Sequence, residues 1–266
     1  METPEQSYLD INRRLWNDKA SVHFTTDFYD LPAFRAGKNM LTPIELAQLG
    51  DVRGKTLLHL QCHFGMDTLS WARLGAQVTG VDFSDVAIHH ARQLAEEEGL
   101  NAKFICCNIY DLPQHLDAQY DIVFTSYGVI GWLPDLTAWG AIVARYLKPG
   151  GVFHFFEFHP VPWMFDNDYQ YIQYSYFNAQ TIVEEVKGSY ADRNASIEGQ
   201  SVSWNHPLCD VLGALLQQGL RLAHFTEFDW SPYNIYPNAT EIAPGKWQIK
   251  GMEGKLPLIY AIKTVK

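Results

Sequence analysis

The chain has 266 residues, 47% of them hydrophobic, and a formal net charge of −10. This length and composition suffice for one large domain with an ample core. The acidic balance disfavours nucleic acid as a partner, because such binding rests on clustered Lys and Arg and the sequence has no basic stripe. No apolar run approaches membrane-spanning length, the first residues are polar and acidic, and the four cysteines form no C-x-x-C pair. We therefore expect a cytoplasmic protein with reduced thiols, no signal peptide and no membrane partner.

Residues 1–51 precede the first expected strand and are rich in aromatic side chains. Tyr8, Leu9, Leu15 and Trp16 fall near helical spacing, which predicts an amphipathic helix. A second helix is expected over Pro43–Leu49. The simplest interpretation is that these aromatic residues pack into the core of the domain.

The next stretch predicts a strand, a loop, a helix and a second strand. Thr56–Leu60 is a short apolar run that suits a strand buried on both faces. After the loop that ends at Gly65, a helix runs to Gly75, and the second strand, Gln77–Val81, leads to Asp82. A carboxylate at this place in an open parallel sheet can accept hydrogen bonds from both hydroxyls of a ribose.

The loop itself discriminates between nucleoside cofactors. A dinucleotide site needs G-x-G-x-x-G, so that the backbone can approach a pyrophosphate at the helix N-terminus. Here the loop reads Gln61-Cys62-His63-Phe64-Gly65, and the acidic Asp67 follows. These residues argue against the interpretation that the protein is an oxidoreductase that uses NAD(P) or a flavin, although that alternative stays open. A sulfonium cofactor with a zwitterionic tail is better tolerated.

With these residues the chain resembles the class I S-adenosylmethionine-dependent methyltransferases of the small-molecule type. The usual loop of that family, acidic-x-Gly-x-Gly-x-Gly, maps onto His59–Gly65, where only Gly65 is retained. The downstream turn Leu147-Lys148-Pro149-Gly150-Gly151 is also frequent in the family, between a helix and a buried strand. The resemblance implies S-adenosylmethionine as the cofactor and a small molecule as the methyl acceptor.

The rest of the chain fits the fold that this resemblance implies, an α/β Rossmann-like doubly wound sheet, mostly parallel with an antiparallel edge hairpin. The expected core elements are the helix Ser84–Glu98, the strands Ala102–Cys107 and Tyr120–Ser126, the helix Leu136–Tyr146, the strand Val152–Phe158, the helix Leu208–Gln218, and the closing strands Arg221–Phe228 and Leu256–Thr264. Alternating residues predict three antiparallel strands in a small β insertion, over Tyr169–Phe177, Thr181–Tyr190 and Ile197–Trp204. No motif is recognisable in Asp229–Gly254.

The implied domain organisation has three parts. Residues 52–160 and 206–266 form the cofactor-binding core, and residues 161–205 form a cap on the substrate side. Residues 1–51 form a helical lid, since excluding water favours transfer from a cationic donor. Contact between chains through the aromatic insertion is a further alternative.

The resemblance also implies site residues. The expected cofactor contacts are Gln61, Cys62, His63, Gly65, Thr68, Asp82, Phe83, Asn108, Ile109, Ser126 and Tyr127. Gln61 and His63 can replace backbone contacts by side-chain contacts, and the Asn108 amide oxygen can accept from the adenine amino group or else shape a turn. The expected substrate-facing residues are Trp16, Phe28, Trp132 and Trp163.

His159 and Glu157, at the end of the fifth strand, are the catalytic candidates. An imidazole with its ordinary pKa near ~6.5 can take a proton from an acceptor hydroxyl, thiol or amine. The predicted reaction is an in-line displacement in which the acceptor attacks the sulfonium methyl. A non-catalytic binding protein on the same fold is the remaining alternative. No metal is expected, because His59, Cys62 and His63 match no standard zinc spacing.

Overall fold

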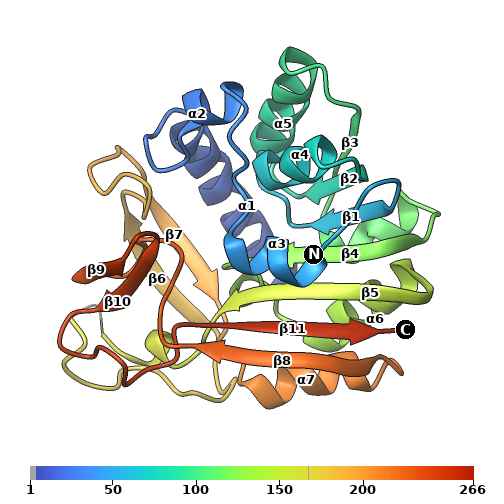
Figure 1. The fold of residues 1–266 in the computed structure, drawn as a ribbon. Coiled ribbons are helices and arrows are strands. Elements are labelled where there is room, and N and C mark those ends of the chain that lie inside the picture. The colour runs from blue at the N-terminus through green and yellow to red at the C-terminus, as the bar shows by residue number, and fades with distance from the viewer. Residues whose placement is uncertain (1–3, 167) are drawn as a thin grey trace.

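The centre of the molecule is a seven-stranded sheet in the order β3-β2-β1-β4-β5-β11-β8 (Figure 1). The computed structural model describes residues 4–166 and 168–266. The strands of this sheet are β1 (Thr56–Leu60), β2 (Gln77–Asp82), β3 (Ala102–Cys106), β4 (Tyr120–Ser126), β5 (Leu147–Phe158), β8 (Arg221–Phe228) and β11 (Ile259–Val265). β1 pairs in parallel with both β2 and β4, whereas β11 runs antiparallel to both β5 and β8. The predicted Rossmann-like sheet with an antiparallel pair at its edge is confirmed.

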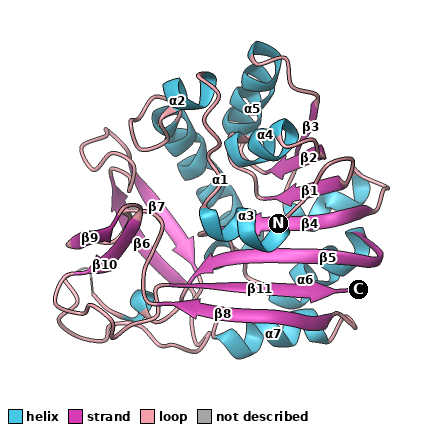
Figure 2. Cartoon of the chain, in the orientation of Figure 1, coloured by secondary structure: helices cyan, strands magenta, loops and turns pink. Residues whose placement is uncertain are grey.

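Helices cover both faces of the sheet (Figure 2). They are α1 (Pro4–His23), α2 (Leu31–Arg35), α3 (Pro43–Leu49), α4 (Met66–Arg73), α5 (Asp85–Glu97), α6 (Leu136–Tyr146) and α7 (Leu208–Leu216), with short 3₁₀ turns η1 (Ile109–Gln114), η2 (Ile130–Trp132) and η3 (Pro162–Met164). Because successive strand residues point to opposite faces, Leu58 of β1 packs with α6 and α7, and Leu57 packs with α3 and α4. Within the described residues, no helix combines the length and the apolar character needed to cross a bilayer.

The insertion contains two strands where three were predicted. β6 (Ile182–Lys187) and β7 (Glu198–Ser203) form an antiparallel hairpin, as expected. The third expected strand, Tyr169–Phe177, is wrong. Its first residue, Tyr169, has φ 57°, and the Asp166 carboxylate accepts the backbone N–H groups of Gln170 and Tyr171, so the chain turns here. Among the described residues of this segment, the bridge Phe165↔Ile172 is the pairing that remains.

A second small hairpin lies in the connection where no motif was recognised. β9 (Ala239–Ala243) and β10 (Lys246–Ile249) pair antiparallel around Pro244-Gly245. Gly245 has φ 67°, a conformation that glycine adopts without steric penalty. The Pro-Gly pair is therefore the signal in the sequence that could have predicted this turn.

Helix α1 connects the parallel core to the insertion. Asn12 donates to the Val202 carbonyl of β7 at 2.7 Å and accepts from the Val202 N–H at 2.9 Å. One turn further along, Asn17 accepts from the Ser84 hydroxyl at 2.7 Å and donates to Asp85 at 2.8 Å, which ties α1 to the start of α5. The expected role of residues 1–51 as a lid stays a prediction, as do the expected domain boundaries.

Candidate functional site

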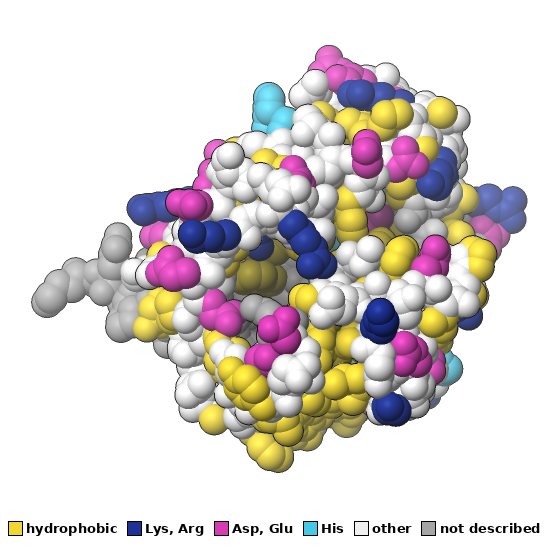
Figure 3. All heavy atoms as spheres, turned by 90° about the vertical axis from the view of Figure 1, so that its left-hand side faces the viewer, with side chains coloured by type: hydrophobic (Ala, Val, Ile, Leu, Met, Phe, Trp, Pro, Cys, Tyr) yellow, Lys and Arg dark blue, Asp and Glu magenta, His cyan; other side chains and the backbone are white. Residues whose placement is uncertain are grey.

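A cavity of about 510 Å³ lies at the carboxyl ends of β1, β2 and β4. Its other walls come from α1 and from the segment that carries β6 and β7. On the face that carries these elements, Figure 3 shows a hollow with hydrophobic side chains inside and acidic and basic side chains around it. The expected site residues that line the cavity are Trp16, Phe28, Gln61, Cys62, His63, Gly65, Asp82, Phe83, Asn108, Ile109, Ser126, Tyr127, Trp132, Glu157 and Trp163.

Asp82 stands where β2 ends and faces this cavity. Its two carboxylate oxygens accept backbone N–H groups, Oδ2 from His63 at 2.8 Å and Oδ1 from Ser84 at 2.9 Å. Burial raises the pKa of Asp82 to about 6, against the opposing effect of these hydrogen bonds. The carboxylate is therefore mostly ionised at neutral pH, and each oxygen keeps a lone pair with which it can accept from a ligand hydroxyl.

The loop after β1 keeps a glycine-like backbone at two positions where this chain has larger residues. Gln61 has φ 59° and His63 has φ 52°, both in the left-handed region. That conformation costs an L-residue about 1–2 kcal/mol. Gly65 has φ 79°, and a Cβ there would approach Phe104 to 2.8 Å, so both conformation and space require glycine. The Gln61 amide nitrogen donates to the Val129 carbonyl at 3.1 Å, and its amide oxygen is buried without a partner among the described residues.

The His63 ring packs against α1 instead of lying free in the cavity. It stacks on His23, with ring centroids 5.2 Å apart, and its Nε2 lies 3.2 Å from Nδ1 of His23. Burial, followed by the positive charge of Lys19, lowers the pKa of His23 to about 3. Burial is also the first cause that lowers the pKa of His63. Both rings are neutral at pH 7, so neither supplies a positive charge to a ligand.

Two expected cofactor contacts have structural roles in the loops. Asn108 caps η1, because its side-chain oxygen accepts the Tyr110 N–H at 3.1 Å, and it also lines the cavity. Thr68 is fully buried and does not line the cavity. Its hydroxyl pairs with Nδ1 of His59 at 2.8 Å, so Thr68 supports the loop from behind.

Glu157 shapes the loop after β4. Its carboxylate accepts the backbone N–H groups of Gly128, Val129, Ile130 and Phe158, the last three at 2.8, 3.1 and 2.6 Å. Burial raises the pKa of Glu157, and the four N–H donors oppose that rise. Because its acceptor sites are occupied by backbone, the geometry gives Glu157 a positioning role and shows no free oxygen to receive an acceptor proton.

His159 is buried outside the cavity lining. Its Nε2 lies 2.9 Å from Oε1 of Glu227 on β8, and its Nδ1 accepts the Val161 N–H at 3.2 Å. Burial lowers the pKa of His159, and Glu227 acts in the opposite direction. With both nitrogens engaged, the geometry gives no support to His159 as the general base.

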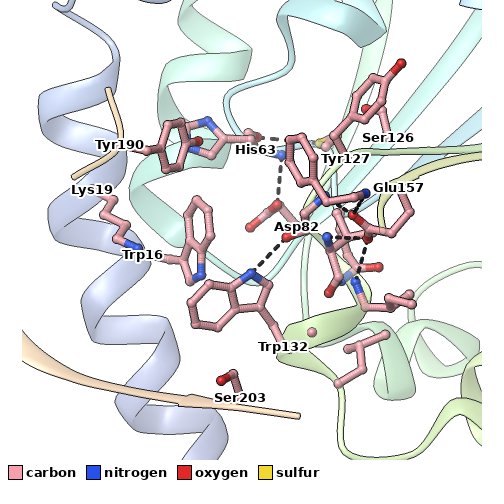
Figure 4. Close-up of a pocket in the computed structure, with 18 of the residues that line it drawn as sticks. Trp16, Lys19, His63, Asp82, Ser126, Tyr127, Trp132, Glu157, Tyr190 and Ser203 are labelled. Carbon is pink, nitrogen blue, oxygen red and sulfur yellow. Dashed lines mark hydrogen bonds between the residues drawn. The ribbon is translucent and has the colours of Figure 1, made fainter. Parts of the chain in front are cut away.

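Two indoles and an ammonium form one wall of the cavity (Figure 4). Trp16 of α1 and Trp132 of η2 meet edge to face, with ring centroids 5.4 Å apart. Trp132 is held by a hydrogen bond from its Nε1 to the Gly128 carbonyl at 2.8 Å. The Lys19 Nζ lies 4.9 Å from the Trp16 centroid and 5.2 Å from the Trp132 centroid.

A further group of aromatic residues lines the cavity next to His23 and His63. Phe28 lies 5.4 Å from Tyr190 and 6.1 Å from Tyr233, measured between ring centroids, and Tyr29 pairs with Tyr190 through their hydroxyls at 2.5 Å. Trp163 is 41% exposed and therefore lies at the margin of the cavity.

Several residues of the cavity were not singled out as site residues from the sequence. The main ones are Lys19, Tyr29, Asp67, Tyr190, Ser201, Ser203 and Tyr233. Lys19 had a usable signal, because it follows Trp16 by three residues and thus shares its helical face. Tyr29 and Tyr233 lie in aromatic connections that the sequence already suggested could cover a pocket, whereas Tyr190 had no such signal.

Known proteins match this arrangement in both sequence and fold. Residues 57–151 match the family model described as a methyltransferase domain. A ubiquinone biosynthesis O-methyltransferase of Idiomarina loihiensis is 35% identical over 102 residues, 38% of this chain and 42% of the relative. One from Xanthomonas oryzae pv. oryzae is 32% identical over 114 residues, 42% of this chain and 47% of the relative. The chain thus spans less than half the length of these curated relatives.

Solved structures extend the likeness to most of the chain. A putative S-adenosylmethionine-dependent methyltransferase from Listeria monocytogenes superposes with a TM-score of 0.57 at 19% identity, over 84% of this chain and 96% of that one. The DhpI complex with S-adenosylhomocysteine gives a TM-score of 0.55 at 18% identity, over 96% of both chains. At these identities the likeness shows the fold. Residues 57–151 therefore match a methyltransferase domain, and the chain as a whole has the fold of solved S-adenosylmethionine-dependent methyltransferases.

Proposed function

We propose that this protein transfers the methyl group of S-adenosylmethionine to a small-molecule acceptor held in the cavity. The observation that carries the proposal is the position of Asp82, an ionised carboxylate at the end of β2 that shares one cavity with an aromatic wall. A ribose needs such a pair of acceptor oxygens, and an acceptor molecule needs the remaining apolar space.

The cavity offers partners for each part of the cofactor. Asp82 would accept from the ribose hydroxyls, and Asn108 and Ile109 would border the adenine. The unpartnered amide oxygen of Gln61 would accept from the amino group of the methionine part. Ser126 and Tyr127, at the end of β4, would border the transferable methyl group.

The chain contributes alignment and water exclusion to the transfer. An acceptor atom held in line with the sulfonium needs no covalent intermediate, so positioning accounts for most of the acceleration. His159 and Glu157 have no place in this proposal, because backbone groups or Glu227 occupy their polar atoms. Asp67 lines the cavity, and burial raises its pKa to about 6, so it is the carboxylate best placed to receive a proton.

The relatives guide the choice of accepting atom. They are described as O-methyltransferases, so we propose an oxygen atom as the first accepting atom to test for this chain. Because the match covers less than half of those proteins, ubiquinone precursors are one acceptor class among several to screen. We keep the cytoplasm as the site of action and a small molecule, not nucleic acid or membrane, as the partner.

Calorimetric titration with S-adenosylmethionine and S-adenosylhomocysteine tests the cofactor. We expect dissociation constants of about 1–100 μM, an ordinary range for an enzyme substrate. Asp82→Asn should weaken the affinity for both compounds by about 10–100-fold, because that is the contribution expected from hydrogen bonds to a charged group. Asp117→Asn, an exposed change with no contact to the cavity, serves as the matched control.

The outcomes separate the three candidate functions. Transfer of labelled methyl groups to a screened acceptor would establish the enzyme. Tight binding of the cofactor without transfer to any acceptor would favour the binding protein. Folded protein that binds neither compound, but copurifies with a nicotinamide or a flavin, would favour the oxidoreductase and end the present proposal.

A further inference from the structure

Lys19 is a largely buried lysine at the cavity wall, and no ion pair among the described residues neutralises its charge. The residue is 7% exposed and lines the cavity. Its Nζ lies over the Trp16 and Trp132 rings, 4.9 and 5.2 Å from their centroids. Among the described residues, no hydrogen bond or ion pair reaches that nitrogen, and the neutral rings of His23 and His63 lie near enough for the charge of Lys19 to lower their pKa values.

An unpaired buried ammonium is energetically unfavourable. Removing such an ion from water costs several kcal/mol after relaxation, and a cation–π contact returns about 0.5–2 kcal/mol. Burial lowers the pKa of Lys19 to about 8, so the group still carries its charge at pH 7. The folded protein therefore retains a positive charge with an incomplete set of partners.

The charge lies on the part of the cavity wall that α1 contributes, and α1 packs against β7. In the view of Figure 4 the two indoles lie between Lys19 and Asp82, and Ser203 of β7 lies below them. Asn12 of α1 is hydrogen-bonded to Val202, which fixes α1 against β7 here. Ser201 and Ser203 line the cavity from that strand.

The remaining charges of the lining are negative. Lys19 is the single Lys or Arg among the described residues that line the cavity, whereas Asp67, Asp82, Glu157 and Glu184 also line it. None of these carboxylates lies within ion-pair distance of Lys19; Glu184, for example, accepts from the Tyr174 hydroxyl at 2.7 Å. An anionic ligand group consequently has one favourable position in this cavity.

We propose that Lys19 is the anchor for a carboxylate of the methyl acceptor, which is an aromatic acid whose ring lies against Trp16 and Trp132. That the bound acid is the methyl acceptor rests on the proposed methyl transfer. The anion site at Lys19 does not depend on that proposal. The ammonium takes the carboxylate, the indoles provide flat apolar surface, and the hydroxyls of Ser201 and Ser203 are available to the rest of the polar group.

Matched pairs of probes test this site without knowledge of the natural acceptor. The pairs are benzoate and benzamide, 1-naphthoate and 1-naphthamide, and indole-3-acetate and its amide, titrated with and without S-adenosylhomocysteine. We expect the acid of at least one pair to bind the native protein about 10-fold or more tightly than its amide, as a charged hydrogen bond implies. Lys19→Met should abolish that preference and leave amide binding unchanged, and Lys19→Arg should keep it.

Lys103→Met is the control, since Lys103 is an exposed lysine outside the lining. Equal affinity of acid and amide in all three pairs would overturn the proposal. A preference that survives in Lys19→Met would overturn it as well.

A second arm identifies the source of the carboxylate. S-Adenosylhomocysteine contains an amino-acid carboxylate, and 5′-methylthioadenosine lacks it. If Lys19→Met weakens the first compound by 10-fold or more and spares the second, the anchor serves the cofactor and the acceptor assignment is wrong. If the native protein binds neither compound but still prefers the aromatic acid, the methyl-transfer proposal fails and the anion site stands.

Discussion

The backbone N–H of His63 donates to Oδ2 of Asp82 at 2.8 Å, and this bond ties the altered loop after β1 to the carboxylate at the end of β2. The residue that replaces a glycine of the usual family loop thus helps to position the group expected to hold the ribose. The loop and the carboxylate therefore form one unit, and their properties can be tested together.

Cofactor binding should depend on pH through Asp82. Burial raises the pKa of this carboxyl to about 6, so the proton is held more strongly in the folded chain than in the unfolded one. A ribose hydroxyl favours the ionised form. We expect the affinity for S-adenosylhomocysteine to fall by about 10-fold per pH unit once the pH drops well below 6. Calorimetry from pH 5 to pH 8 measures this, and the dependence should be lost in Asp82→Asn.

The left-handed backbone at Gln61 and His63 makes a stability prediction. At each position the Gly variant should be more stable than the Ala variant by about 1 kcal/mol, because Ala keeps the strain and Gly relieves it. Both changes remove the same side-chain contacts, so their difference isolates the backbone. Urea unfolding of Gln61→Gly against Gln61→Ala, and of the corresponding His63 pair, measures it. An Ala variant as stable as its Gly partner would contradict the assigned backbone.

Lys19→Met should stabilise the free protein while it removes the anion preference. The folded pKa of about 8 lies below the ordinary value, so charge is more favourable in the unfolded chain. The resulting destabilisation is complete below pH 8 and disappears as the pH rises toward the unfolded pKa. We expect a gain of about 1–3 kcal/mol at pH 7 that shrinks above pH 8, measured by urea unfolding at several pH values. A loss of stability at pH 7 would mean that Lys19 is already compensated.

His159→Gln should leave methyl transfer within about 3-fold of the native rate, whereas loss of a general base costs about 100-fold or more. The ring lies outside the cavity lining, where it contacts Glu227 and the Val161 N–H. Rates over a pH series, with unfolding measured in parallel, check this. A large drop in kcat without a drop in stability would restore His159 as the base.

The parts of the fold that local patterns determine could be predicted from the sequence. Thr56–Leu60 and Gln77–Val81 are mostly buried runs with turn signals at their ends, and the end of the second run predicted where Asp82 would lie. Tyr169–Phe177 alternates like a strand, but whether a strand forms depends on a partner ladder, which the sequence does not display. The predicted strand failed for that reason.

For the site, too, the sequence predicted which residues lie near the cavity but not how distant side chains pair. Trp16 and Trp132 were expected at the cavity and line it. The stacking of His63 on His23 joins segments 40 residues apart, and the contact of His159 with Glu227 spans 68 residues. Such pairs depend on how helices and distant strands dock, so the sequence did not reveal that these histidines are engaged with one another or with other side chains.

Helix α1 holds Ser84, beside Asp82, through Asn17 and holds β7 through Asn12. Helix α1 is therefore hydrogen-bonded both to the part of the cavity near Asp82 and to the part formed by β7. A ligand that limits the motion of α1 near Asp82 also limits its motion near β7. The resulting change in the binding free energy of the second ligand equals the change that the second ligand causes for the first. Cofactor and acceptor should therefore report each other's presence in their affinities, even where they do not touch.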